Sequence, residues 1–339
     1  MKAIVNTTYG SPDVLQFKDV EKPSPTDDEV LIKVLAASVN AADLHFLRAD
    51  PFLIRFMSGL LKPKTTILGA DIAGRVEAVG KNVTQFKPGD EVFGDISGCG
   101  WGGFAEYVCA SEDALALKPT NLSFEEAAAV PMAAVTALQG LRNKGQIQPG
   151  QKVLINGASG GVGTFAVQIA KSFGAEVTGV SSTRNVDMAR SIGADHVIDY
   201  TQADFTKNGK QYDLILAANG DRSISEYKRA LAPKGTYVTS GGSGAQAFQA
   251  MIFGPGISMT GSKKMGNLLA RPNKKDLTFL KELLEAGKVV PIIDRRYPLR
   301  EVPEALRYLE EGHAKGKVVI TIGTEQPGLA SSGEERSRK

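Results

Sequence analysis

Small residues fill positions 157–163, between a stretch typical of a buried strand, 152–156, and a stretch with helical spacing of apolar side chains, 164–173. A chain that turns sharply and brings its backbone N–H groups close to a pyrophosphate has no room for bulky side chains. A helix that begins near Gly161 or Val162 would also direct the positive end of its dipole at that anion. The spacing predicts a dinucleotide-binding turn, and an empty tight turn is the alternative. The candidate residues are Ala158, which stands where the usual motif has its first glycine, Ser159, Gly160, Gly161, Val162 and Gly163.

The residues at the end of the next predicted strand, 177–181, bear on which dinucleotide binds. A site for NAD usually has an aspartate or glutamate there, which accepts hydrogen bonds from the ribose hydroxyls. This chain continues instead with Ser181, Ser182 and Arg184, two hydroxyls and a guanidinium. A charge-assisted hydrogen bond from Arg184 to a 2′-phosphate would contribute about 1.5–3 kcal/mol, roughly 10- to 100-fold in affinity. The pattern favours NADP(H); the alternative is that Arg184 is an exposed residue at a helix start.

The elements around this turn alternate between strand and helix, which specifies a parallel sheet covered on both faces. Strands are predicted at 153–156, 177–181, 197–198, 212–217 and 236–239, with helices at 164–173, 186–191 and 224–231. Beyond Asn267 the chain has candidate helices at 275–286 and 302–311 and candidate strands at 289–293 and 317–322.

The front of the chain is rich in short strands and poor in helix. Its strand candidates are 2–6, 29–39, 72–79, 91–93, 104–109 and 114–117, separated by glycine and proline. Ser123 with Glu126 predicts a capped helix start, followed by linked helices that break at Pro131 and continue to Leu141. The patterns predict an α/β chain with four parts: a β-rich domain over 1–123, a doubly wound domain over 124–267, a return to the first domain over 268–323, and a flexible tail over 324–339.

Composition narrows the classes of protein to which this chain can belong. A chain of 339 residues is longer than a single hydrophobic core usually supports, which favours two domains. Its 42% apolar and 23% charged content is that of a globular protein. A net charge of +3 without a basic stripe gives no reason to expect nucleic acid. Two cysteines, Cys99 and Cys109, and a start without a signal-type segment favour the cytoplasm.

No stretch approaches the roughly 18 apolar residues that span a bilayer, so no integral membrane segment is expected. The most apolar irregular stretch is Pro51–Leu61. Two interpretations of it stay open: it packs over the core or the substrate cleft, or it touches a membrane surface.

Several motifs together resemble the medium-chain dehydrogenase/reductase superfamily. They are Gly69-Ala70-Asp71-Ile72-Ala73-Gly74, Lys87-Pro88-Gly89-Asp90-Glu91-Val92, Gly103-Phe104-Ala105-Glu106-Tyr107-Val108, the turn up to Gly163, Gly193-Ala194-Asp195 and Gly316-Lys317-Val318-Val319. Within the superfamily the chain is similar to the zinc-independent quinone oxidoreductase branch, which includes enone reductases. The resemblance implies a GroES-like β-barrel domain, a Rossmann domain and a cofactor in the cleft between them. It also allows for a homodimer.

Further cofactor contacts are implied by the resemblance alone. They are Thr136 near the nicotinamide, Tyr200 near the 2′-phosphate, Asn219, Gly220, Ser240 and Gly241 in loops after two later strands, and His313 and Lys315 near the chain end.

The resemblance places Asn40 and Gly69-Ala70-Asp71 where zinc-dependent relatives have a cysteine and a Gly-His-Glu motif. We therefore expect no metal. Without a Lewis acid an isolated ketone is hard to reduce, because nothing strongly positive faces the developing alkoxide. A conjugated carbonyl spreads the charge into an enolate that hydrogen-bond donors can stabilise. Asn40 is the candidate donor, with capping of the strand end as the alternative role, and Asp43 either orients it or lines the site.

These expectations combine into an NADPH-dependent, zinc-independent oxidoreductase for α,β-unsaturated ketones, aldehydes or quinones. Neither a Tyr-x-x-x-Lys motif nor a Gly-x-x-x-x-Gly-Lys-Ser/Thr motif occurs, which argues against a short-chain dehydrogenase and a nucleotide triphosphatase. An alternative from a different functional class is an NADPH-binding protein with a structural or regulatory role and little turnover.

Overall fold

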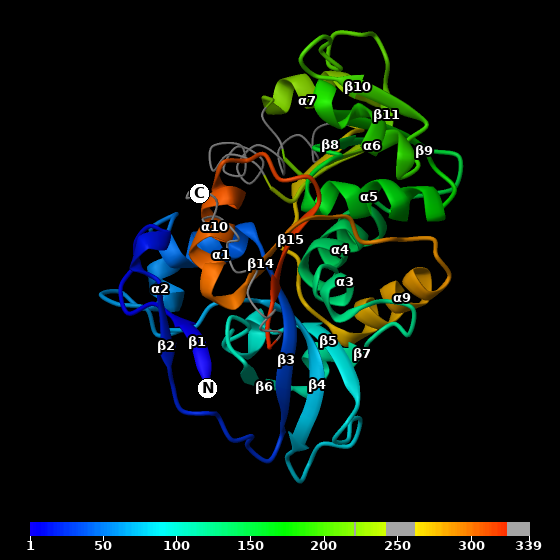
Figure 1. Ribbon diagram of the computed structural model, residues 1–339. Coiled ribbons are helices and arrows are strands. Elements are labelled where there is room, and N and C mark those ends of the chain that lie inside the picture. Colours follow the sequence, from blue (N-terminus) through cyan, green and yellow to red (C-terminus); the bar gives the residue numbers. More distant parts are fainter. Residues whose placement is uncertain (220–221, 242–261, 324–339) are drawn as a thin grey trace, which may run out of the picture.

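The computed structural model describes residues 1–219, 222–241 and 262–323, and it contains two large sheets (Figure 1). The parallel sheet and its helices lie at the upper right of Figure 1, and the other sheet lies below. The predicted α/β class, a GroES-like domain with a Rossmann domain, is confirmed. The expected contact at Gly220 and the expected flexible tail, 324–339, lie outside the described residues.

The seven-stranded sheet has the order β14-β15-β3-β4-β5-β7, with β6 also paired to β3. Its strands are β3 (Glu29–Val39), β4 (Asp71–Val79), β5 (Glu91–Asp95), β6 (Tyr107–Ser111), β7 (Leu115–Leu117), β14 (Ile293–Pro298) and β15 (Lys317–Thr321). Only the β14–β15 pair is parallel. Strand β15, near the end of the chain, pairs with β3, so the chain returns to the sheet that its front part forms.

The front of the chain contains more helix than its sequence indicates. A small sheet of β1 (Lys2–Val5) and β2 (Gln16–Asp19) stands beside α1 (Ala41–Arg48) and α2 (Ile54–Ser58). At the start of helix α1, Asp43 Oδ2 accepts the backbone N–H of Asn40 at 2.7 Å, and the Asn40 backbone carbonyl accepts the N–H of Asp43 at 3.0 Å. Asn and Asp replace the usual Ser/Thr and Glu of a capping box, which explains why the sequence analysis did not predict the helix.

The six-stranded sheet is entirely parallel, with the order β10-β9-β8-β11-β12-β13. Its strands are β8 (Lys152–Asn156), β9 (Glu176–Ser181), β10 (His196–Asp199), β11 (Tyr212–Ala217), β12 (Leu231–Thr239) and β13 (Lys264–Asn267), and its helices are α5 (Gly161–Ser172), α6 (Val186–Ser191) and α7 (Ile224–Ala230). In chain order this is 3-2-1-4-5-6, the doubly wound arrangement that places ligands at the carboxyl ends of the strands. The sequence missed only β13 among these strands.

Two helices connect the sheets: α3 (Phe124–Ala128) packs on β3 and β4, and α4 (Pro131–Leu138) packs on α5. The predicted capping box of Ser123 with Glu126 is present. A π-helical stretch, Gln139–Lys144, extends α4. One apolar core therefore runs from the seven-stranded sheet through α3 and α4 to one face of the parallel sheet.

The strand predicted at 289–293 is wrong, because β14 begins only at Ile293. Val290 instead donates its N–H to Gln168 Oε1 at 2.8 Å and accepts a hydrogen bond from Gln168 Nε2 at 3.0 Å. The amide side chain thus replaces a strand partner. Helices α9 (Lys274–Glu285) and α10 (Val302–Glu310) lie close to their predicted bounds.

The Pro51–Leu61 stretch does not bury its apolar side chains against the described residues, because Phe52, Phe56 and Leu61 expose 62%, 65% and 94% of their surfaces. Packing on the core is therefore wrong for these side chains, whereas cover over the substrate cleft and contact with a membrane surface stay predictions. Among the described residues, none of the helices has the length and apolar content to cross a bilayer.

Candidate active site

The glycine turn has the tight geometry that the sequence predicts. Helix α5 begins at Gly161, with Gly160 as its N-cap. A methyl group at Gly163 would lie 1.9 Å from the Gly157 carbonyl oxygen, so the strand end and the helix start touch. At Gly160 a methyl group would meet only one atom within 4 Å, at 3.6 Å. The first turn of a helix leaves its N–H groups without partners in the helix, so this open side of the turn can receive an anion.

Buried polar atoms without partners lie at or after the carboxyl ends of β9 and β12. The Oγ atoms of Ser181 and Ser240 and Oδ1 of Asn185 are buried and lack a hydrogen-bond partner in the part of the chain that the structure describes. Asn185 Nδ2 meanwhile donates to Ser159 Oγ at 3.1 Å and Ser182 Oγ at 3.3 Å. Orphaned buried groups are costly unless a ligand completes them. These residues therefore fit a nicotinamide dinucleotide, and Asn185 joins the set that the sequence proposed.

A carboxylate from the neighbouring strand β10 lies beside the end of β9, which the residues of β9 alone do not indicate. Asp199 is the strand partner of Ser181. Thr183 Oγ1 donates to Asp199 Oδ2 at 2.6 Å and Thr201 Oγ1 donates to Oδ1 at 2.8 Å. The hydrogen bond from Thr183 is the main cause that lowers the pKa of Asp199. Its negative charge is thus engaged by two hydroxyls.

The other predicted cofactor residues follow four strands of the parallel sheet, β9, β10, β11 and β12. Arg184 is exposed in a short 3-10 turn, and Tyr200, also exposed, donates its N–H to the Ser181 carbonyl at 3.0 Å. Asn219 lies against Gly157, where an added methyl group would be 3.0 Å from its Cβ. Ser240 follows β12 and donates its N–H to the Ala217 carbonyl at 3.1 Å.

Three predicted residues show local contacts only. Gly241 accepts a hydrogen bond from Thr239 Oγ1 at 2.9 Å, Lys315 donates its N–H to Asp294 at 2.9 Å, and His313 is exposed. Their proposed contacts with a cofactor stay predictions.

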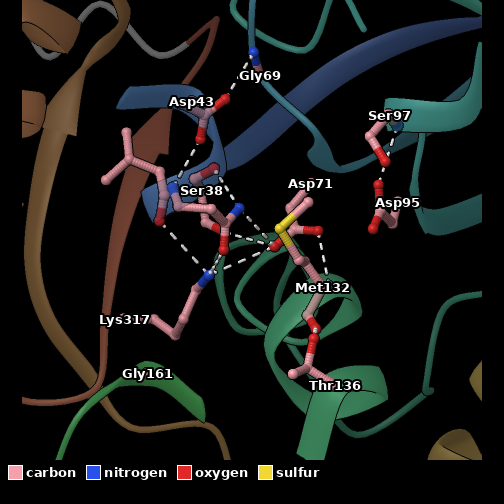
Figure 2. Close-up of polar contacts among 12 residues, drawn as sticks. Ser38, Asp43, Gly69, Asp71, Asp95, Ser97, Met132, Thr136, Gly161 and Lys317 are labelled. Atoms are coloured by element: carbon pink, nitrogen blue, oxygen red, sulfur yellow. Dashed lines mark hydrogen bonds and ion pairs between the residues drawn. The ribbon is translucent and has the colours of Figure 1, made fainter. Parts of the chain in front are cut away.

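The second part of the site is a buried polar cluster at the ends of three inner strands, β15, β3 and β4, of the seven-stranded sheet (Figure 2). Ser38 lies near the end of β3, Asn40 caps α1, Asp71 starts β4 and Lys317 starts β15. Their exposed fractions are 0%, 8%, 0% and 3%. Strand register places Ser38 opposite Asp71 and Val39 opposite Val318, so the fold itself brings the cluster together.

The contacts within the cluster fix the orientation of the Asn40 amide. Lys317 Nζ donates to Asn40 Oδ1 at 2.5 Å and lies 3.4 Å from Asp71 Oδ2. Asn40 Nδ2 donates to the same Asp71 oxygen at 3.0 Å and to the Ser38 carbonyl at 3.4 Å. An ammonium only donates and a carboxylate only accepts. One orientation of the amide therefore satisfies both neighbours: Oδ1 toward Lys317 and Nδ2 toward Asp71.

Two more buried carboxyl groups flank this cluster. Asp43 Oδ2 accepts the Asn40 N–H at 2.7 Å, and Oδ1 accepts the Gly69 N–H at 3.1 Å. Burial, reinforced by Asp71, raises the pKa of Asp43 to about 7. Burial also raises the pKa of Asp95 to about 7, again with a contribution from Asp71. Asp43 thus holds the start of α1, which agrees with an orienting role toward Asn40.

The start of β15 joins this cluster to the glycine turn. Gly316 donates its N–H to the Ser159 carbonyl at 2.9 Å and forms a bridge with Gly160. A methyl group at Gly161 would lie 3.2 Å from Lys317 Cδ. On the opposite side of Asp71, Oδ1 accepts the Met132 N–H at 2.9 Å, and the Met132 carbonyl accepts the Thr136 hydroxyl at 2.7 Å. The turn, Thr136 and the cluster therefore form one site.

The cluster does not fit a zinc ion. Zinc in proteins is held by thiolate, imidazole or carboxylate ligands. Here an amide and one carboxylate face each other, and the ammonium of Lys317, itself a cation, already contacts an oxygen of each. Within the described residues no group of three or more His, Cys, Asp or Glu side chains is arranged to hold a metal ion.

Comparison with known proteins agrees with this arrangement. Residues 26–120 match the model of the alcohol dehydrogenase GroES-like domain, and 192–320 match that of zinc-binding dehydrogenases. The 2-methylene-furan-3-one reductase of Solanum lycopersicum is 38% identical over 331 residues, covering 94% of this chain and 79% of the relative. The chain belongs to the medium-chain dehydrogenase/reductase superfamily.

Other relatives of this dehydrogenase/reductase place it in the branch that the motifs indicate. A chloroplastic NADPH-dependent alkenal/one oxidoreductase of Arabidopsis thaliana is 34% identical, covering 94% of this chain and 79% of the relative. The solved quinone oxidoreductase from Coxiella burnetii aligns with a TM-score of 0.85 and 32% identity, covering 95% of this chain and 99% of the other. The resemblance to quinone oxidoreductases and enone reductases is confirmed. The protein is an oxidoreductase with a nicotinamide cofactor.

Proposed function

We propose that this oxidoreductase reduces the activated C=C bond of α,β-unsaturated ketones and aldehydes, or quinones, with NADPH and without a metal. One observation carries the proposal: the buried Asn40–Lys317–Asp71 cluster adjoins the glycine turn, where a zinc-dependent relative would have metal ligands. The names of the relatives, an enone reductase, an alkenal/one oxidoreductase and a quinone oxidoreductase, support the same reaction class.

The residues of the glycine turn and those at the end of β9 would hold the cofactor. The N–H groups of Gly161, Val162 and Gly163 would face its diphosphate, and Ser181 and Asn185 would complete their hydrogen bonds with its ribose. Bound NADPH supplies the hydride that reaches the substrate. Arg184 and Tyr200 would lie near the 2′-phosphate, while Thr183 and Thr201 keep Asp199 hydrogen-bonded. This arrangement favours NADPH over NADH.

Asn40 would donate a hydrogen bond to the substrate carbonyl oxygen. One hydrogen of Nδ2 bonds Asp71, and the other makes only a long contact of 3.4 Å with the Ser38 carbonyl. That second hydrogen is available to a substrate. Lys317 and Asp71 act as positioning residues, because together they prevent the amide from presenting its oxygen to the carbonyl oxygen. Lys317 also adds positive charge next to the developing enolate.

This chemistry selects conjugated carbonyls. An amide donor and a nearby ammonium stabilise a delocalised enolate, whereas a localised alkoxide from a saturated ketone needs a stronger electrophile. The site thus matches acceptors in which the negative charge spreads over several atoms.

A substrate panel tests the proposal. We expect NADPH oxidation with medium-chain enones, enals or quinones, almost none with saturated ketones, and no change with a zinc chelator. Tight NADPH binding without turnover over the whole panel would instead support the alternative, a structural or regulatory NADPH-binding protein. A cytoplasmic location and a homodimer stay predictions.

A further inference from the structure

An exposed apolar surface surrounds α2, in the stretch that connects α1 with β4. Ten large hydrophobic side chains of the described residues are exposed, and five of them fall within ten consecutive positions. These five, which define the 52–61 surface, are Phe52, Leu53, Phe56, Leu60 and Leu61, with exposed fractions from 56% to 94%. Isolated exposed apolar residues are ordinary, but a contiguous group marks a binding surface.

Polar contacts hold this segment in place while its apolar side chains face outward. The Tyr9 hydroxyl lies 2.8 Å from Ser58 Oγ and donates to the Gly59 carbonyl at 2.6 Å. The guanidinium of Arg55 stacks 4.8 Å from the Tyr9 ring centre and 5.4 Å from that of Phe52. Lys64 N–H donates to the Ser58 carbonyl at 2.7 Å. The surface is therefore a built feature of the fold.

Basic side chains outnumber acidic ones beside the 52–61 surface, where Asp50 is the one exposed carboxylate directly before it in the sequence. Arg55, Lys62 and Lys64 lie within or beside it, and no aspartate or glutamate occurs from Pro51 to Ala70. A second copy of the chain docked through the same surface would bring like charges together, which opposes self-association. An anionic lipid surface offers both an apolar phase and negative phosphates.

We propose that the 52–61 surface docks this protein on an anionic bilayer as a peripheral contact. The phenylalanine and leucine side chains would enter the boundary of the acyl chains, and the basic side chains would meet lipid phosphates. Helix α1, whose N-cap is Asn40, leads directly to this surface. A docked molecule would thus have its candidate site one short helix from the lipid. Docking requires no turnover, so vesicle binding tests it independently of the proposed reduction.

Co-sedimentation of the full chain with phosphatidylglycerol/phosphatidylcholine vesicles tests this proposal. We expect binding that falls strongly on vesicles of phosphatidylcholine alone and at high salt. Lys62→Gln with Lys64→Gln should weaken binding roughly 30-fold, since each basic residue contributes about fivefold. Phe56→Ser with Leu61→Ser should abolish sedimentation. The matched control, Phe17→Ser with Leu117→Ser, removes exposed apolar side chains elsewhere and should bind like the unmodified protein.

Thermal midpoints and NADPH affinity check that each variant is folded. Equal vesicle binding by the Phe56→Ser/Leu61→Ser variant would overturn the proposal, as would no binding by the unmodified protein. A dimer that dissociates in this variant, without vesicle binding, would show self-association instead. A changed KM for enones without vesicle binding would show that the segment covers the substrate site. Either result also overturns bilayer docking.

Discussion

Replacing Lys317 by methionine removes the ammonium that orients Asn40 and keeps most of the side-chain volume. Lys317 and Asp71 are 3% and 0% exposed, and removing one partner of such a buried pair costs about 3–5 kcal/mol of unfolding free energy. The Asn40 amide also loses its 2.5 Å hydrogen bond, so it can rotate and present its oxygen to the substrate. Losing one donor to a developing oxyanion typically lowers kcat about 100- to 1000-fold.

We therefore expect Lys317→Met to lower kcat for an enone about 100-fold, with NADPH affinity changed far less. Asn40→Ala should have a similar effect, and the double variant should be at most about threefold slower than either, because the two residues act as one unit. Stopped-flow single turnovers and urea unfolding measure the two effects. Lys33→Met, on the exposed side of β3, is the control and should change neither.

The reasoning fails if Lys317→Met keeps the kcat of the unmodified protein while Asn40→Ala loses it. It fails equally if the two losses multiply in the double variant, because independent effects would mean that Lys317 does not act through Asn40.

Three further predictions concern the cofactor site and the buried carboxyl groups. Arg184→Ala should weaken NADPH about 10- to 100-fold and NADH little in fluorescence titrations, and equal losses would contradict the phosphate pocket. Gly163→Ala forces a methyl group to 1.9 Å from the Gly157 carbonyl, so cofactor affinity and the thermal midpoint should both fall, whereas Gly98→Ala, with nothing within 4 Å, should change neither. Because the pKa of Asp95 is raised to about 7 by burial, the folded state binds more protons than the unfolded state, and the unfolding free energy should fall as pH rises from about 4 to 7, by up to about 1.4 kcal/mol per unit of pKa difference. Asp43, whose pKa burial also raises to about 7, adds to the same slope, so Asp95→Asn should reduce the slope in urea titrations without removing it. An unchanged slope would show that Asp95 does not contribute.

Much of the fold was predictable because its signals are local. The bounds of β3, β11 and α6 match the sequence patterns at both ends. The start of β14 was not predictable, because the competing partner of Val290 is Gln168, a side chain 122 positions away. Likewise, α1 was missed because its cap uses Asn40 and Asp43 in place of the common residue pair.

The candidate site was predictable where one motif contains it. The glycine turn and the stretch from Ser181 to Arg184 are short segments with their own chemistry. Only part of the cluster could be predicted from the sequence. Asn40 was proposed, but its partner Lys317 is 277 positions away and contacts it because β15 pairs with β3. Asn185 gave no signal beyond its place after Arg184, and Asp199 is brought beside the end of β9 by strand pairing. Contacts of this kind depend on topology, which residue spacing does not contain.

The destination of the hydride tests the central claim most directly. Single-turnover reduction of an enone with NADPH deuterated at C4 of the nicotinamide, on the transferred face and in the presence of a zinc chelator, should place one deuterium on the β-carbon of the product, as read by NMR. Deuterium on the carbonyl carbon, or loss of all transfer on chelation, would contradict metal-free reduction of the C=C bond at this site.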